Sequence, residues 1–337
     1  MELKTLCELQ GPSGREEQVR AVILTACQKL DGVEAKLDRM GNVLATKKGT
    51  AKKPKHVMLC AHMDEVGLMV VSATDEGLLR VCALGGIDPR VLVSKRVLVG
   101  KEKLPGIIGA TAIHLQSAED RKSVLPIDQL YVDIGAKDKE EALSLAKEGT
   151  YITFDTPYTP FGDGLVMAKA LDDRVGCYNL LRVLSGTYPC DITCAFTCQE
   201  EVGCRGATGA AYRLQPDMAL VLEGTTAADT GDTPIASQVC CVGQGVAVSW
   251  MDNSSIARPD FFQAMAKTAD SAKVRWQVKR SVSGGNEAGV IQRSGAGVQT
   301  LVLSVPCRYI HSPNTVCALT DVEAQLALCQ AFLATVK

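Results

Sequence analysis

Apolar and polar residues alternate in two different ways along this chain. In its first and last parts, near-continuous apolar runs predict strands buried on both faces of a sheet, at residues 56–60, 192–197, 218–222 and 298–305. Between these runs apolar residues recur at helical spacing, and Ser13 is the predicted N-cap of the first helix. Strands that alternate with helices predict the α/β class, with a mixed sheet flanked by helices.

The middle of the chain has a different pattern of apolar residues. Short β-branched runs, separated by turn residues such as Asp75-Glu76-Gly77, follow one another from residue 67 onward. Strands at this spacing are typical of a small β-barrel or sandwich. We therefore expect a β-rich domain over residues 67–163, inserted into a discontinuous α/β domain of residues 1–66 and 164–337. Thr156–Phe161 is the expected linker out of the insert.

Composition narrows the class of protein. Of 337 residues, 46% are hydrophobic and 22% are charged, and the net charge of -2 without a basic patch argues against nucleic-acid partners. The chain has no charged leader followed by an apolar segment, and no apolar run approaches the roughly 20 residues of a membrane span. We expect no membrane contact and a cytoplasmic location. The 14 cysteines lack paired CxxC spacing and are expected to be reduced core residues.

Acidic residues and a histidine follow two of the predicted strands directly. His62 and Asp64 come after the run at 56–60, and Glu200 and Glu201 come after the run at 192–197. Ligands of α/β sheets usually bind at the carboxyl ends of the strands. Successive side chains of an extended segment point apart, so Glu200 and Glu201 are expected to have different roles. A solvated acidic turn and a structural histidine are the alternatives.

Three further residues complete a candidate metal-binding set. Asp172 lies at the start of a predicted helix, where capping is the alternative role, and Glu223 and His311 follow later strands. Two histidines and three carboxylates suit a pair of divalent ions such as zinc or cobalt, bridged by one carboxylate and one water or hydroxide. Two such metals polarise a carbonyl and generate hydroxide near neutral pH. With Glu200 as general base, the chemistry is amide hydrolysis. The candidate ligands are His62, Asp172, Glu201, Glu223 and His311.

Seven motifs in this order resemble one family. They are AHMDEVG, ALDDRVG, CQEEVGCRGA, VLEGTTAADT, MDNSS, SGGNEAG and RYIHSP, and they cover nearly the whole chain. The chain is similar to the dinuclear metal aminopeptidases that build tetrahedral particles, the group of glutamyl and deblocking aminopeptidases. The resemblance implies removal of N-terminal residues from short peptides. It also implies a zinc-exopeptidase-like catalytic domain interrupted by a β-barrel-like dimerisation domain, with dimers that assemble into a dodecamer.

The resemblance also implies a role for each candidate residue. His62 and Glu201 would be terminal ligands on opposite metals, and Asp172 would bridge them. Glu223 and His311 would complete the two ligand sets. Glu200 would be the base, Asp64 would orient His62, and a strained cis peptide between Asp172 and Asp173 would aim the bridge.

The sequence departs from the family pattern at two places, and other functions remain open. The family often has Asp at the position of Glu223, and it commonly has Gly-Gly-Thr-Asp where this chain has Gly284-Gly285-Asn286-Glu287, so the preferred N-terminal residue stays open. The alternatives are a non-catalytic oligomeric scaffold, a glycosidase that uses Glu200 and Glu201, and a deacylase or carboxypeptidase of similar fold. Cys198 and Cys204, which flank the proposed base, are expected to pack beside it.

Overall fold

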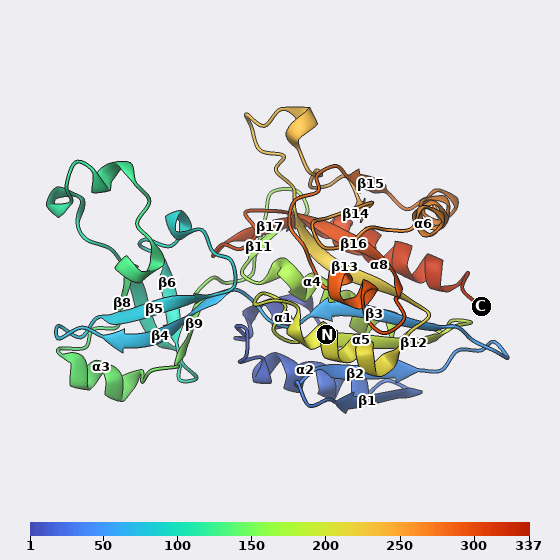
Figure 1. Cartoon of the computed structure of the whole chain (residues 1–337), viewed down its shortest axis with the longest axis horizontal. Coiled ribbons are helices and arrows are strands. Elements are labelled where there is room, and N and C mark those ends of the chain that lie inside the picture. Colours follow the sequence, from blue (N-terminus) through green and yellow to red (C-terminus); the bar gives the residue numbers. More distant parts are fainter.

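The computed structural model describes residues 1–337 apart from the side chain of Asp120. Figure 1 shows two bodies side by side, a large sheet flanked by helices and a smaller β-rich body formed by the middle of the chain. The large sheet has eleven strands, and the smaller body is a closed barrel. This architecture confirms the predicted fold class, an α/β protein with an inserted β-barrel.

The large sheet is mixed. Its main order is β1-β2-β12-β3-β13-β16-β17-β11-β10, with β14 paired to β16 and β15 paired to β14. Strands β12, β3, β13 and β16 run parallel to one another, so their carboxyl ends meet at one edge. The bounds are β1 Val33–Leu37, β2 Val43–Lys47, β3 His56–His62, β10 Thr159–Phe161, β11 Leu165–Ala168, β12 Asp191–Thr197, β13 Met218–Thr226, β14 Val246–Ser249, β15 Trp276–Lys279, β16 Gln299–Arg308 and β17 Thr315–Ala318.

Helices cover both faces of this sheet. Successive residues of β3 show why its sequence is apolar throughout: Val57 and Leu59 pack into one hydrophobic core, and Met58 and Cys60 pack into a second. The first core includes residues of α2, α4, α6 and α8, and the second includes residues of α5 and α7. The bounds are α1 Leu3–Glu8, α2 Glu17–Gln28, α4 Leu171–Val183, α5 Arg205–Leu214, α6 Pro259–Ser271, α7 Ala288–Gln292 and α8 Leu319–Leu333.

The barrel has a core of its own. Its strands close in the order β4-β5-β8-β7-β6-β9, around buried side chains such as Leu79, Val97 and Phe154. An arm of short 3₁₀ turns between β7 and β8 extends away from it, and α3 lies near β4 (Figure 1). The bounds are β4 Gly67–Ala73, β5 Leu79–Leu84, β6 Arg96–Val99, β7 Leu104–Gly109, β8 Tyr131–Asp133, β9 Tyr151–Phe154 and α3 Lys139–Leu145.

Three local expectations differ from the structure. The predicted linker Thr156–Phe161 ends in β10, which pairs with β11 at the margin of the large sheet. Glu223 lies within β13 rather than after it, because that strand continues to Thr226. Ser13 does not cap α2, where Glu16 holds the N-cap position, because the Ser13 hydroxyl donates instead to Asp64. Among the described residues, none of the helices has the length and apolar character needed to cross a bilayer.

Candidate metal centre and active site

The predicted site residues meet at the carboxyl edge of the parallel strands. His62 is the last residue of β3 and lies opposite Thr197, the last residue of β12. The turn that carries Glu200 and Glu201 begins there, and β13 brings Glu223 alongside. Asp172 comes from the kinked first turn of α4, where the Asp172–Asp173 peptide bond is cis, and His311 comes from the β16–β17 connection.

In both candidate histidines, one ring nitrogen is hydrogen-bonded to a backbone carbonyl and the other faces carboxylates. Nδ1 of His62 lies 3.1 Å from the Asp64 carbonyl, and Nδ1 of His311 lies 2.9 Å from the Gly86 carbonyl. Because a carbonyl only accepts, both Nδ1 atoms carry the hydrogen. Each Nε2 then has a lone pair free for a metal, the tautomer that a histidine ligand of this kind needs.

Asp172 lies between the two histidines. Its Oδ1 is 3.4 Å from Nε2 of His62, and its Oδ2 is 3.3 Å from Nε2 of His311. Each histidine also faces a second carboxylate: Oε1 of Glu223 lies 3.3 Å from Nε2 of His62, and Oε2 of Glu201 lies 3.5 Å from Nε2 of His311. The five residues therefore form two half-sites that share Asp172.

The buried oxygen atoms of this cluster fit a cation. Oδ1 of Asp172 and both carboxylate oxygens of Glu223 are buried, and no hydrogen-bond donor reaches them. An unpaired buried carboxylate is costly, and a divalent cation would remove that cost. Two nitrogen and several oxygen donors are also the ligand types that borderline divalent metals prefer. The residues therefore fit divalent metal binding.

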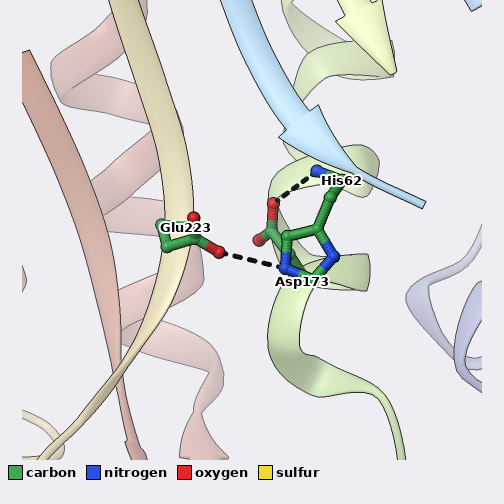
Figure 2. A group of neighbouring side chains, drawn as sticks. All are labelled: His62, Asp173 and Glu223. Carbon is green, nitrogen blue, oxygen red and sulfur yellow. Dashed lines mark hydrogen bonds and ion pairs between the residues drawn. The ribbon is translucent and has the colours of Figure 1, made fainter. Parts of the chain in front are cut away.

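Asp173 is close to this cluster but has another structural role. Figure 2 shows its carboxylate beside His62 and Glu223, and ligand atoms of the three residues lie within 4.8 Å of one another. One of its oxygens, however, accepts from the backbone N–H of His62 and the other from that of Gly176, each at 3.1 Å. We therefore regard Asp172, whose Oδ1 has no such donor, as the better ligand.

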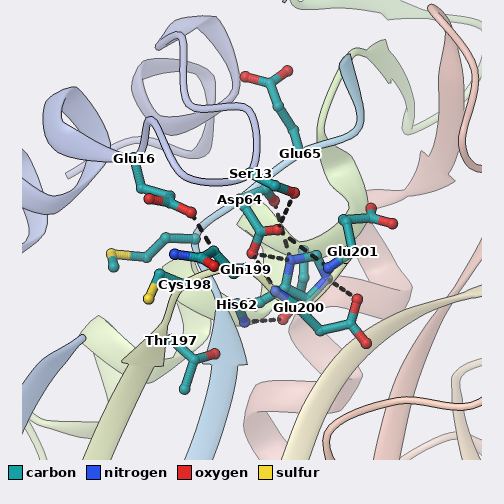
Figure 3. A network of polar contacts seen from close by, with 12 residues as sticks. Ser13, Glu16, His62, Asp64, Glu65, Thr197, Cys198, Gln199, Glu200 and Glu201 are labelled. Carbon is teal, nitrogen blue, oxygen red and sulfur yellow. Dashed lines mark hydrogen bonds and ion pairs between the residues drawn. The ribbon is translucent and has the colours of Figure 1, made fainter. Parts of the chain in front are cut away.

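Asp64 connects the candidate metal ligand His62 to the turn with the two glutamates (Figure 3). Its Oδ1 accepts from the backbone N–H of Glu200 at 2.9 Å and lies 3.5 Å from Nδ1 of His62. Its Oδ2 accepts from the backbone N–H of Glu201 at 3.2 Å and from the Ser13 hydroxyl at 2.6 Å. One buried carboxylate thus orients His62 and holds both glutamates in place.

Glu200 and Glu201 have different surroundings, as their adjacency predicts. Oε2 of Glu201 faces His311, whereas Oε2 of Glu200 lies 4.0 Å from Nε2 of His62. Glu200 also lines an open cleft of about 890 Å³ next to the cluster, with room for a small ligand or short peptide. Residues from the barrel, from the glycine-rich loop and from the β16–β17 connection form its walls.

The charge balance of the cluster favours a cation. Burial raises the pKa of Glu201 to about 8, and burial together with the Asp173 charge raises that of Glu223 well above its usual range. Burial alone would lower the pKa of His311, but its hydrogen bond to Asp172 and the charge of Glu201 outweigh burial and raise the pKa to about 9. Without a metal, protons thus supply the positive charge that these carboxylates require.

The glycine-rich motif divides between the cleft and the interior. Gly284, Gly285 and Asn286 line the cleft. Glu287 turns away and is fully buried, where it accepts a hydrogen bond from the Cys60 thiol at 3.0 Å. Of the two departures in this motif, Asn286 is therefore the one that lines the cleft, although its side-chain amide is engaged with Asp252 and the Ala288 N–H.

Sequence reasoning missed a buried ion-pair network that supports Asp172. The Lys169 ammonium donates to both oxygens of Glu65, at 2.7 and 2.8 Å, and to the Leu9 carbonyl. Arg174 donates to Glu65 and to the Met63 carbonyl. A signal was present, because Lys169 and Arg174 flank Asp172–Asp173 within an otherwise apolar stretch, but their partner Glu65 lies about a hundred residues away.

Known proteins with similar sequences and structures identify the family of this chain. A sequence model of the M42 glutamyl aminopeptidase family matches residues 41–328. A protein of Acetivibrio thermocellus named putative aminopeptidase is 34% identical over 330 residues, 97% of this chain and 96% of that protein. The aminopeptidase APDkam598 of Desulfurococcus kamchatkensis superimposes with a TM-score of 0.94 at 31% identity, over 99% of this chain and 94% of that chain. The TET1 peptidase of Pyrococcus horikoshii, which can assemble into a tetrahedron or a large octahedral shell, has a TM-score of 0.86 at 34% identity, over 99% of this chain and 98% of that chain.

One similar structure has a different name. A Thermotoga maritima chain named endoglucanase is 30% identical with a TM-score of 0.81, over 99% of this chain and 96% of that chain. The family match and the aminopeptidase relatives nevertheless favour the predicted peptidase over the glycosidase and scaffold alternatives. The protein is a metal-dependent aminopeptidase, as predicted. The chain belongs to the M42 glutamyl aminopeptidase family.

Proposed function

We propose that this protein releases N-terminal residues from short peptides at a centre of two metal ions, with Glu200 as general base. The observation that carries the proposal is the position of Asp172, whose two oxygens face two different histidines at 3.4 and 3.3 Å. A single metal would need only one of these half-sites, whereas a shared carboxylate is the usual way to hold two metals close together.

The residues of each half-site suggest which metal they would hold. His62, Asp172 and Glu223 would bind one ion, and His311, Asp172 and Glu201 would bind the other. Imidazole and carboxylate donors suit zinc or cobalt. When bound, the metals would polarise the scissile carbonyl and make a water molecule more acidic.

Glu200 is the residue proposed to move the proton. As the water oxygen attacks the carbonyl carbon, the carboxylate of Glu200 takes the water's proton. The C–N bond then breaks, and Glu200 delivers that proton to the leaving amine nitrogen. Asp64 contributes by holding His62 and the Glu200 backbone in fixed positions.

The inserted β-barrel and the related peptidases support a proposal about the oligomer that this chain forms. We infer that residues 67–163 form a dimerisation domain between the two parts of a catalytic domain, 1–66 and 164–337. The exposed apolar side chains of the barrel arm, Ile113 and Leu115, support this inference because such residues commonly become buried in protein interfaces. Dimers would assemble into a dodecamer like the shells known for related peptidases, and confinement would restrict substrates to short peptides.

Hydrolysis of a panel of free and N-blocked aminoacyl substrates tests this proposal. We expect cleavage of free N-termini only, loss of activity on chelation, and recovery with zinc or cobalt. Glu200→Gln should reduce kcat by at least about 100-fold, the usual contribution of a general base, while it still binds metal. Cleavage of blocked substrates alone would indicate a deacylase, and a fully active Glu200→Gln variant would contradict the assignment of the base.

A further inference from the structure

The turn that carries the proposed base contains a thiol close to its carboxylate. Sγ of Cys204 lies 3.3 Å from Oε1 of Glu200, in the orientation of a donor. The backbone forms a tight turn here, because the N–H groups of Gly203 and Cys204 both donate to the Glu200 carbonyl, at 2.8 and 2.9 Å. Cys204 therefore contacts Glu200 through main chain and side chain.

The two carboxylate oxygens of Glu200 point to different partners. Oε1 accepts from the Cys204 thiol, and Oε2 lies 4.0 Å from Nε2 of His62, on the side of the metal-binding cluster. No other side-chain donor to the Glu200 carboxylate is present among the described residues. The thiol is thus the group that determines which oxygen turns toward the cluster.

We propose that Cys204 is a positioning residue for the aminopeptidase reaction: its S–H donates to Oε1 of Glu200 and holds Oε2 toward the attacking water. This inference rests on the proposed role of Glu200 as base. Burial and the neighbouring Glu200 charge raise the pKa of Cys204, so the thiol keeps its hydrogen and remains a donor. We expected Cys204 only to pack beside the base, but its thiol also forms a hydrogen bond with the Glu200 carboxylate.

The other thiol that flanks the base provides a matched control. Cys198 is fully buried six residues earlier in the same segment, and its thiol donates to the Met40 carbonyl and to Asn42 rather than to Glu200 (Figure 3 shows it beside Gln199). Its removal deletes the same chemical group without touching the base.

The test compares substitutions at Cys204 in the full-length, metal-loaded enzyme. Cys204→Ala removes the donor and places no β-branched side chain at this residue, whose backbone is left-handed with a φ of 52°. It should reduce kcat about tenfold with little change in KM, since misplacing a reacting group lowers the rate of the chemical step. Cys204→Ser keeps an O–H donor and should recover most of kcat. Cys198→Ala should leave kcat near that of the wild type.

Further readouts separate a positioning role of Cys204 from general damage to the protein and from failure of the base assignment. Metal content and thermal midpoint should stay the same in the Cys204 variants; equal losses of kcat in Cys204→Ser and Cys204→Ala would overturn the inference. Adding Cys204→Ala to Glu200→Gln should cause no further loss, because the thiol acts through that carboxylate. If Glu200→Gln is inactive but Cys204→Ala has wild-type kcat, the inference about Cys204 fails while the proposed base stands.

Discussion

At the scale of single residues, Asp172 is the main determinant of the proposed site. The two histidines, Glu201 and Glu223 each face one half of the cluster, whereas Asp172 faces both. The hydrogens on Nδ1 of His62 and His311, each directed to a backbone carbonyl, leave Nε2 free on the side of Asp172. This arrangement explains why carboxylates remain without donors inside the protein.

Metal binding should release protons. Without a metal, the pKa of His311 is about 9 and that of His62 is well above its usual range, because nearby carboxylates outweigh the effect of burial. Both rings are therefore protonated at pH 7 and must lose a proton to bind a metal, so affinity should rise with pH up to about 9. Calorimetric titration with zinc at pH 7, in buffers of different ionisation enthalpy, should show release of at least two protons per chain, because Glu201, with a pKa of about 8, also carries a proton in the metal-free protein. Zinc uptake without proton release would show that the two rings are already neutral in the metal-free protein at pH 7.

Glu223 should be sensitive to side-chain length. Glu223→Asp withdraws the carboxylate from His62 by one methylene, so the metal of that half-site should bind roughly tenfold more weakly, equivalent to about 1.4 kcal/mol. The other metal should be unaffected, since Glu201 and His311 do not contact Glu223. Competition with a chromophoric chelator measures both affinities. Glu223→Gln removes the charged donor altogether, and an unchanged metal affinity in that variant would show that Glu223 is not a ligand.

At the scale of elements, the buried network of Glu65, Lys169 and Arg174 fixes the start of α4. It joins the end of α1, the β3–β4 connection and the residues that precede Asp172. All three charged side chains are almost completely buried. The site is thus held by contacts between segments that are distant in sequence.

Lys169→Met should destabilise the protein strongly. The substitution leaves the Glu65 carboxylate buried without its main partner, and removing one member of a buried ion pair typically costs about 3–5 kcal/mol. Urea unfolding of the metal-free protein measures the loss. The double variant Glu65→Gln with Lys169→Met should lose less than the sum of the two single variants; additive losses would rule out coupling between the pair.

The strands and their connections show how much of the fold and of the site the sequence predicts. Apolar runs identified the strands β3, β12, β13 and β16, and the residues that follow or end them identified the site. Pattern reasoning missed β10 and the contact between Ser13 and Asp64, because each depends on a partner elsewhere in the chain. The residues themselves made Asp172 a candidate ligand, with helix capping as the alternative, but only the family resemblance made it the carboxylate shared by both metals.

At the scale of the whole molecule, the barrel lies at one side of the catalytic sheet and forms one wall of the cleft (Figure 1). Its arm exposes two neighbouring large apolar side chains, Ile113 and Leu115, at 70% and 71% of their surface. The proposed assembly would bury them.

Charged substitutions on the arm should disrupt the assembly and spare the chemistry. Ile113→Lys with Leu115→Lys should lower the particle mass measured by analytical ultracentrifugation, because burying lysines in an interface is unfavourable. Activity on a small aminoacyl substrate should persist. Tyr212→Lys, at an equally exposed aromatic residue on α5, serves as the control and should not change the mass. An unchanged particle in the arm variant would place the interface elsewhere.

The most direct test of the account is the position of the bound metals. A crystal of the zinc-loaded protein, measured on both sides of the zinc absorption edge, gives each metal as an anomalous peak. We predict two peaks, one beside His62 and Glu223 and one beside His311 and Glu201, with an oxygen of Asp172 bound to each. A single peak, or a metal bound by Asp173 in place of Asp172, would contradict the shared-carboxylate centre.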